Sequence, residues 1–270
     1  MKKENSINNK WWEERATIHE KSEYYNIAGL INGDIRLRNF EIEEMGDVKN
    51  KKLLHLQCHM GTETLSWARL GAKVTGIDFS LNAIKVAKRI SKQAGVDVNY
   101  IHSNVYDSLK HFKKDSFDIV YVSVGSLHWL NDINKWANVV YNLLKPGGIL
   151  YIYEFHPVSS VLSKTEPLFE RNYFSTNNVL WDEEGSYTDS KVKTKNNKHI
   201  IWDRPLCEII NAILNVGLNL EIFKERHGQE GKQFSYLVKN KSGLWVVPKG
   251  VGTFPSTFTL RAKKNIHEKN

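Results

Sequence analysis

The chain has 270 residues, of which 41% are hydrophobic and 25% charged, so it is long enough and apolar enough to bury a full core. Its net charge is +8 at pH 7, but the lysines are scattered rather than gathered in one arm, which permits a nucleic-acid partner without favouring one. Two cysteines exclude a disulfide framework, and neither a secretory signal pattern nor a run of about 20 apolar residues is present, so we expect a cytoplasmic protein with no membrane contact.

The first segment, residues 1–50, has the pattern of amphipathic helices. Aromatic residues, among them Trp12 and Tyr24, are interleaved with glutamate and lysine. We expect this segment to be helical and to pack its aromatic side chains on the rest of the protein.

Between residues 51 and 156, short apolar runs alternate with helical patterns. The expected strands are 53–58, 73–78, 98–102, 117–123 and 149–155, and the expected helices are 62–70, 81–94 and 134–144. Ser80 stands where it would cap the second of these helices. Strands that alternate with helices in this way predict a parallel sheet covered on both faces and joined by right-handed crossovers.

The rhythm breaks after residue 156. Residues 157–204 are polar and irregular, which indicates an inserted cap with weak strands or a flexible loop. Regular patterns return in residues 205–270, with a helix over 205–216, a strand over 218–224, an irregular stretch over 225–255 and a last strand over 257–262.

The stretch from Leu53 to Asp78 has the layout of a nucleotide site. A strand ends in a tight turn, a helix begins near Thr62, and an acidic residue closes the next strand roughly 20 residues further on. This layout directs backbone N–H groups and a helix N-terminus towards a ligand at the carboxyl edge of the sheet. Asp78 is placed to accept hydrogen bonds from two ribose hydroxyls.

Residues 54–61, Leu-His-Leu-Gln-Cys-His-Met-Gly, resemble the first motif of class I S-adenosylmethionine-dependent methyltransferases, which usually reads apolar-Asp-apolar-Gly-Cys-Gly-x-Gly. Gln57 and His59 replace two of the glycines, and His55 replaces the acidic residue. Gly61 stays where a close approach is needed, and Thr-Glu-Thr follows it to open a helix.

Further strings match the same family in order. Residues 74–80 resemble its second motif, and residues 117–120 resemble its fourth-strand motif. Residues 103–105, Ser-Asn-Val, fall where the family usually has Gly-Asp-Ala beside the adenine, and residues 144–148 read Leu-Lys-Pro-Gly-Gly. The resemblance covers about residues 50–156 well, and it extends to the C-terminal elements by order only.

The resemblance implies an α/β, Rossmann-like, doubly wound fold with a mostly parallel seven-stranded sheet and one antiparallel strand. It implies a lid over 1–50, a cofactor-binding core over 51–156, an inserted cap over 157–204, and a last helix and two strands of the same domain over 205–270. The implied cofactor is S-adenosylmethionine, and the product is S-adenosylhomocysteine. The implied cofactor-binding residues are Gln57, Cys58, His59, Gly61, Asp78, Phe79, Ser80, Asn104, Val105 and Ser123.

The acceptor should lie beyond the carboxyl ends of the strands, which favours a small molecule held beside the segment after the fourth strand. His128 and Trp129 replace residues of the family's Leu-His-His-Leu string, and His128 is the candidate catalytic residue, either as a general base or as a wall of the pocket. Trp12, Tyr24 and His156 are further candidate acceptor contacts.

Other functions remain open at this point. The charge permits an RNA methyltransferase, although the Asn-Pro-Pro-aromatic string of enzymes that methylate base amines is missing, and the altered first motif permits a cofactor-binding protein that has lost catalysis. The histidines do not have the spacing of metal ligands on one helix, so no metal is expected, and Cys58 is expected to pack rather than to react. The protein is expected to be a monomer or a homodimer.

Overall fold

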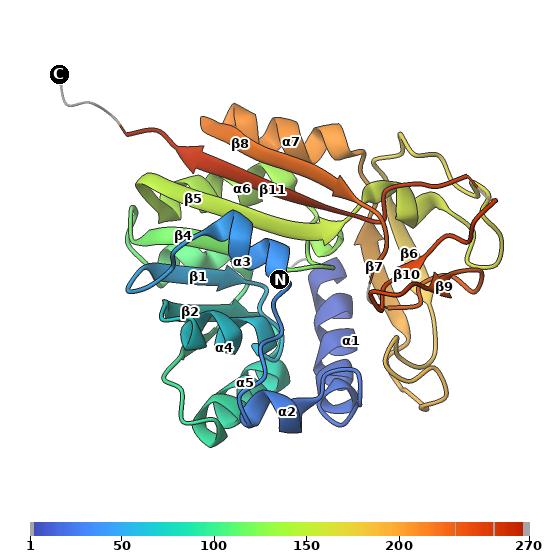
Figure 1. Cartoon of the computed structure of the whole chain (residues 1–270), viewed down its shortest axis with the longest axis horizontal. Helices are drawn as coiled ribbons and strands as arrows, with labels where there is room; N and C mark the ends of the chain where they lie inside the picture. Colours follow the sequence, from blue (N-terminus) through green and yellow to red (C-terminus); the bar gives the residue numbers. More distant parts are fainter. Residues whose placement is uncertain (1–2, 230, 251, 267–270) are drawn as a thin grey trace.

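The computed structural model describes residues 3–229, 231–250 and 252–266. Residues 1–2 of the expected lid and residues 230, 251 and 267–270 of the expected C-terminal segment therefore lie outside the described residues. The centre of the fold is a seven-stranded sheet with the strand order β3-β2-β1-β4-β5-β11-β8 (Figure 1). The strands are β1 (Lys52–Leu56), β2 (Lys73–Asp78), β3 (Asn99–His102), β4 (Phe117–Val122), β5 (Leu144–Phe155), β8 (Leu218–Arg226) and β11 (Thr257–Lys264).

The direction of the strands confirms the expected fold class. β1 pairs in parallel with β2 and β4, and the parallel pairing continues to β3 and β5. β11 pairs antiparallel with both β5 and β8, so it is the one strand of this sheet that runs against the others. β5 begins earlier than expected, because the Lys-Pro-Gly-Gly segment after Leu144 already belongs to the strand.

Helices cover both faces of the sheet because its inner strands are apolar on both sides. Leu53 joins a core cluster with α3 (Asn39–Met45) and α4 (Thr62–Arg69), whereas its neighbour Leu54 joins the opposite cluster with α6 (Ile133–Leu143) and α7 (Leu206–Asn215). Successive strand residues point to opposite faces, which explains this division. α5 (Leu81–Gln93) packs with α4 and α2 (Ile27–Ile31), and Ser80 caps it as expected by accepting from Ala83 N at 3.1 Å.

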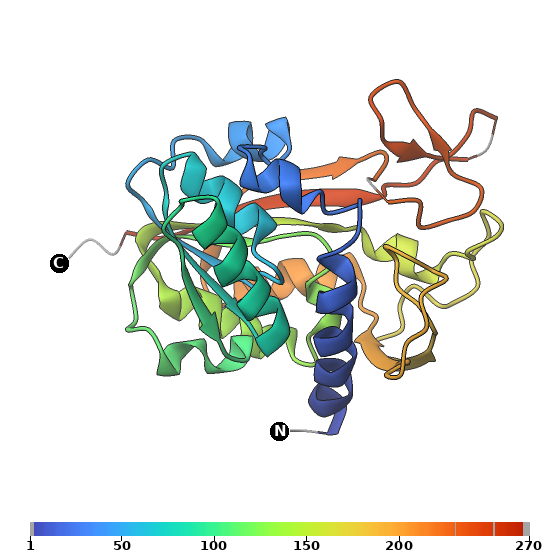
Figure 2. The ribbon, with the colours of Figure 1, turned by 90° about the horizontal axis from the view of Figure 1, so that it is seen from below.

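The N-terminal helix α1 (Lys3–His19) stands across the carboxyl ends of the strands, between the sheet and the cap (Figures 1 and 2). It packs against α5 on one side and against strand β7 on the other. Within the described residues, no helix combines the length and the apolar character that crossing a membrane requires.

The cap contains more regular structure than a loop. Its strands β6 (Asn178–Asp182) and β7 (Lys198–Trp202) pair antiparallel, and a second ribbon of β9 (Val238–Lys239) and β10 (Trp245–Val246) lies at the same end of the molecule but apart from them (Figures 1 and 2). Among the residues that the structure describes there are also three short 3₁₀ helices: η1 (Val105–Lys110), η2 (Leu127–Trp129) and η3 (Pro157–Val161). Cap, ribbon and α1 therefore all gather at the same edge of the sheet.

Candidate cofactor and acceptor site

The turn between β1 and α4 is tightly folded. Gln57, His59 and Gly61 all have positive φ angles, of 55°, 48° and 71°. A Cβ atom on Gly61 would lie 2.7 Å from Cε1 of Tyr100, so the turn requires glycine there for space as well as for conformation. Gln57 and His59, which replace family glycines, therefore adopt the left-handed backbone conformation that glycine favours.

Asp78 ends β2 beside this turn. Its carboxylate accepts hydrogen bonds from His59 N at 2.9 Å and from Ser80 N at 2.8 Å. Only 7% of the residue is exposed, and this burial raises the pKa of Asp78 to about 6, although the two N–H groups oppose the effect. A carboxylate offers about four lone-pair positions, so two remain for hydroxyl donors of a ligand.

Gln57 carries the clearest sign of a missing partner on this turn. Its Nε2 donates to the carbonyl of Ser126 at 2.9 Å, which fixes the amide. Its Oε1 is buried and has no hydrogen-bond partner among the described residues. A ligand with an N–H donor, such as an amino group, would satisfy this oxygen.

His55 is bound within the protein rather than aimed at a ligand. Its Nδ1 lies 2.8 Å from Thr64 Oγ1, and its Nε2 lies 3.0 Å from Ser123 Oγ. Burial lowers its pKa to about 4, so the ring is neutral at pH 7. Burial also raises the pKa of Cys58 well above its usual range, so this residue is an unreactive thiol. The described residues contain no group of histidine, cysteine and carboxylate side chains arranged to hold a metal.

The remaining expected cofactor residues lie at the ends of β2 and β3. The Phe79 carbonyl accepts from Asn9 Nδ2 at 2.8 Å, which ties α1 to this edge. The Asn104 Oδ1 caps η1 by accepting from Tyr106 N at 3.0 Å, and Val105 beside it is buried. Because its oxygen is committed to the cap, Asn104 offers N–H donors to a ligand, where the family's aspartate offers only acceptors.

α1 covers the turn with aromatic side chains. The ring of Trp12 lies 5.0 Å from that of His59 and 5.1 Å from that of Trp129. Trp11, another aromatic residue of this segment, extends the cover, because its ring lies 5.4 Å from that of Trp129 and 5.0 Å from that of His199. These contacts join the lid to both the β1–α4 turn and the cap.

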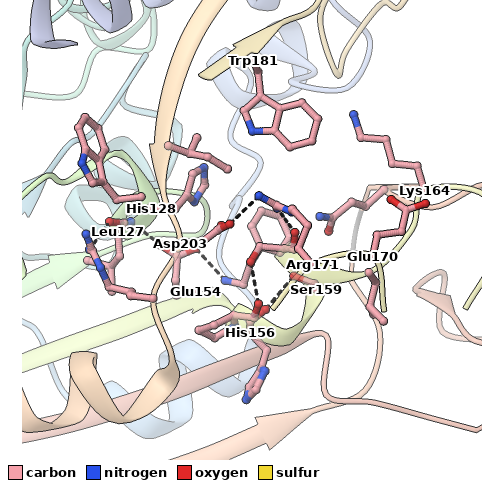
Figure 3. Close-up of a pocket in the computed structure, with 18 of the residues that line it drawn as sticks. Leu127, His128, Glu154, His156, Ser159, Lys164, Glu170, Arg171, Trp181 and Asp203 are labelled. Carbon is pink, nitrogen blue, oxygen red and sulfur yellow. Dashed lines mark hydrogen bonds and ion pairs between the residues drawn. The ribbon is translucent and has the colours of Figure 1, made fainter. Parts of the chain in front are cut away.

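A cavity of about 500 Å³ opens beyond the ends of β4 and β5, between η2, η3, the cap and the C-terminal segment (Figure 3). Aromatic side chains form much of its wall, namely Trp129, Phe155, Trp181, Trp202 and Phe234. Its volume is within the range of small-molecule sites. The cavity occupies the place where an acceptor was expected.

Some of the expected acceptor residues line the cavity and others do not. His128, Trp129 and His156 line the cavity. Trp12 touches Trp129 from the lid, and Tyr24 lies away from the cavity wall, with the Arg36 guanidinium 5.4 Å from its ring centroid. Sequence reasoning left out His199, Arg171 and Asp203, which come from the cap and its junction with α7, where no periodic pattern marked them.

His128 is a weak candidate for a general base. Burial, with the nearby His199 and Arg204, lowers its pKa to about 3. A base with so low a pKa takes a proton poorly at pH 7. His156 has a structural task, because its Nδ1 accepts from Val158 N at 3.1 Å and so caps η3.

The comparisons with known proteins agree with this geometry. Residues 54–152 match the model of a family described as a methyltransferase domain. The chain is 33% identical over 132 residues to a ubiquinone/menaquinone biosynthesis C-methyltransferase of Pectobacterium atrosepticum, covering 47% of this chain and 51% of that protein. It is 27% identical over 154 residues to a ubiquinone biosynthesis O-methyltransferase of Photorhabdus laumondii, covering 56% of this chain and 58% of that protein. The chain thus spans about half the length of the curated relatives it matches.

Among solved structures, an S-adenosylmethionine-dependent methyltransferase from Mesorhizobium loti has the same fold, with a TM-score of 0.57 and 20% identity over 87% of this chain and all of that one. The fold is therefore that of S-adenosylmethionine-dependent methyltransferases, and residues 54–152 match a methyltransferase domain, so S-adenosylmethionine is the cofactor that the similarity implies. The residues present fit that cofactor, because the Asp78 carboxylate suits ribose hydroxyls and the unpaired Gln57 Oε1 suits its amino group.

Proposed function

We propose that the protein transfers a methyl group from S-adenosylmethionine to a small-molecule acceptor. The observation that carries the proposal is the cavity of about 500 Å³, which lies at the carboxyl ends of β4 and β5, at the same edge of the sheet as Asp78 at the end of β2. Gln57 links the two regions, because it belongs to the cofactor turn and its amide bonds Ser126, just before η2.

The cofactor supplies a methyl group already activated on a sulfonium, so the protein need only bind, orient and exclude water. Asp78 and the backbone of the β1–α4 turn bind at one end, and Gln57 and Asn104 add polar contacts. Trp12, Trp129 and the cap keep water from the space between the cofactor and the cavity. A proton acceptor is needed only for an acceptor that must lose a proton.

The shape of the site favours a small acceptor over RNA. Residues of η2, of η3, of the cap and of the segment before the ribbon line the cavity, whereas a base in a folded RNA would require an open approach. The +8 charge stays the argument for RNA. A monomer or a homodimer in the cytoplasm stays the prediction from the sequence.

The test is to incubate the protein with S-adenosylmethionine carrying a labelled methyl group, together with a small-molecule extract or with bulk RNA. We expect label in a small molecule and release of S-adenosylhomocysteine. Label in RNA alone would establish the RNA alternative. Tight cofactor binding without any turnover would instead identify a protein that has lost catalysis.

A further inference from the structure

We propose that Asp203 recognises the acceptor, and that the acceptor is an uncharged ring compound whose hydroxyl group donates a hydrogen bond to this carboxylate. The inference deepens the proposed function and rests on it, because the bound compound is a methyl acceptor only if the protein transfers methyl groups. It concerns a binding contact, and it assigns Asp203 no proton transfer.

One oxygen of Asp203 lacks a partner. The residue follows β7 directly, lines the cavity and is 6% exposed. Its Oδ2 accepts from Arg171 Nη1 at 2.5 Å, and this pair is drawn in Figure 3. Its Oδ1 is buried without a hydrogen-bond partner among the described residues. The neighbouring Ser160 hydroxyl lies close enough to oppose the rise in the pKa of Asp203, but its O–H is directed to the Pro157 carbonyl at 2.8 Å.

The nearby Glu154 shows what a satisfied carboxylate looks like in the same cavity. Its oxygens accept from four backbone N–H groups, including Ser126 N at 2.7 Å, Leu127 N at 2.8 Å and Phe155 N at 2.7 Å. Glu154 thereby holds η2 against β5 and has no need of a ligand. Since buried polar groups are normally paired, the open oxygen of Asp203 calls for a donor from the ligand.

The charges of the wall select against an anionic acceptor. Lys164 Nζ is paired with Glu183 Oε1 at 2.5 Å, and Arg171 is paired with Asp203. Arg204 donates to two backbone carbonyls around η2. Each cationic side chain that lines the cavity is therefore engaged, so a phosphate or carboxylate on the acceptor would find no uncommitted cation in this part of the described chain.

The remaining wall suits a flat apolar body. Phe234 is 2% exposed, and the rings of Trp181 and His199 stack at 10° with centroids 6.5 Å apart. The indole Nε1 of Trp181 is also buried without a partner among the described residues, so it can donate to an oxygen of the ligand. Burial lowers the pKa values of His128 and His199, so both imidazoles add neutral ring surface at pH 7. A ring that carries a hydroxyl meets these conditions together.

The experiment compares four probes with the same ring: phenol, anisole, benzoate and benzylamine. Their binding to the full protein is measured by ligand-observed NMR in the presence of S-adenosylhomocysteine. A hydrogen bond to a charged group changes affinity by roughly tenfold or more, so phenol should bind about tenfold tighter than anisole. Benzoate should bind more weakly than phenol.

The variant Asp203→Asn sharpens the test. Arg171 will keep the amide oxygen, which turns the N–H₂ group to the cavity and removes the acceptor. We expect the preference for phenol over anisole to disappear in Asp203→Asn. The matched control is Glu183→Gln, which neutralises a wall carboxylate that is already paired with Lys164, and it should keep the preference.

Three results would overturn the proposal: no binding of any probe up to its solubility, tighter binding of benzoate or benzylamine than of phenol, or an unchanged preference in folded Asp203→Asn. If Asp203→Asn does not fold, the order of affinities of the four probes for the unaltered protein still tests the proposal. The same titrations report binding of S-adenosylhomocysteine itself. Its absence would remove the proposed function while leaving the order of the probes intact.

Discussion

His19 at the end of α1 and His59 in the cofactor turn lie 2.9 Å apart, Nδ1 to Nε2, so one imidazole donates its N–H to the other. The other nitrogen of His19 lies 2.7 Å from Ser186 Oγ in the cap. The backbone N–H of His59 donates to Asp78. Lid, cap and cofactor edge are therefore joined by one short chain of hydrogen bonds that requires neutral histidines.

Acid should weaken this junction. Burial lowers the pKa of His19 to about 2 and that of His59 to about 4, against about 6.5 in the unfolded chain. Between pH 6.5 and 4 the unfolded state therefore binds more protons than the folded state, and the free energy of unfolding must fall as pH falls. Each such histidine contributes up to about 1.4 kcal/mol per pH unit. Above pH 6.5 both states are neutral and this contribution is constant.

The variant His19→Gln checks the assignment, because it keeps a polar side chain but cannot be protonated. Urea unfolding at a series of pH values from 7 to 4.5 should show a smaller loss of stability in the variant, by about one proton. His111→Gln, at the end of η1, is the control and should keep the slope of the unaltered protein. An identical slope in His19→Gln would show that His19 binds its proton equally in both states.

Asp78→Ala should weaken binding of S-adenosylmethionine by at least about tenfold, because it removes the carboxylate that suits two ribose hydroxyls. Calorimetry on the folded variant measures this directly. Asp118→Ala, which removes a carboxylate paired with Lys145 at the start of β4, should leave affinity unchanged. Equal affinity in Asp78→Ala and the unaltered protein would refute the assignment, and preferential binding of NAD would point to another class of enzyme.

The same carboxylate predicts a pH dependence of cofactor binding. Burial raises its pKa to about 6, and only the ionised form accepts from both hydroxyls. Affinity should therefore be constant above pH 6 and fall by up to about tenfold per pH unit below it. Titrations at pH 7, 6 and 5 test this, and Asp78→Ala should lose this part of the dependence.

Much of the core could be predicted because periodic patterns and turn chemistry act locally. β2 has the expected bounds, Lys73–Asp78, and the last strand, expected over 257–262, is β11 (Thr257–Lys264). The place of His128 and Trp129 followed from the rule that ligands lie at the carboxyl ends of parallel strands. The partners of α1 could not be predicted, since an amphipathic pattern shows which side chains are buried but not what covers them.

Asp203 was missed for a related reason. It is a single polar residue between β7 and α7, and its meaning depends on Arg171, which lies 32 positions earlier in the chain. A lone aspartate in a polar cap has no periodicity that separates it from a solvated one. Only the packing of the cap against η2 shows that one of its oxygens is buried and unpaired.

His128→Ala should change the acceptor KM more than kcat, with kcat reduced by less than about tenfold. The reason is its lowered pKa of about 3, which makes it a poor proton acceptor and leaves it as a wall of the cavity. Steady-state kinetics with the acceptor found by labelling measure both constants. A loss in kcat of about 10²–10⁴-fold with cofactor binding intact would instead establish His128 as a general base.

Arg15 should hold the cap on the lid. Its side chain is fully buried and donates to the carbonyls of Asn196 at 2.5 Å and Gly185 at 2.9 Å, and to Thr194 Oγ1 at 3.2 Å. Arg15→Met keeps the aliphatic stem but removes the donor to the two carbonyls, so the free energy of unfolding should fall by about 2–4 kcal/mol. The cap should loosen before the core, because its residues 183–196 are held to α1 by these bonds.

Limited trypsin digestion separates loosening of the cap from global unfolding, since the cap offers Lys191, Lys193 and Lys195 as cleavage sites. We expect Arg15→Met to be cut in this segment at a denaturant concentration where the sheet is still folded. The control is Arg89→Met, which removes a half-exposed guanidinium paired with Glu20, the residue after α1, and should change stability by less than about 1 kcal/mol. If both variants are cut in the cap at the rate of the unaltered protein, the cap is held by the aromatic contact between Trp11 on α1 and His199 in the cap, and Arg15 contributes only to the stability of α1.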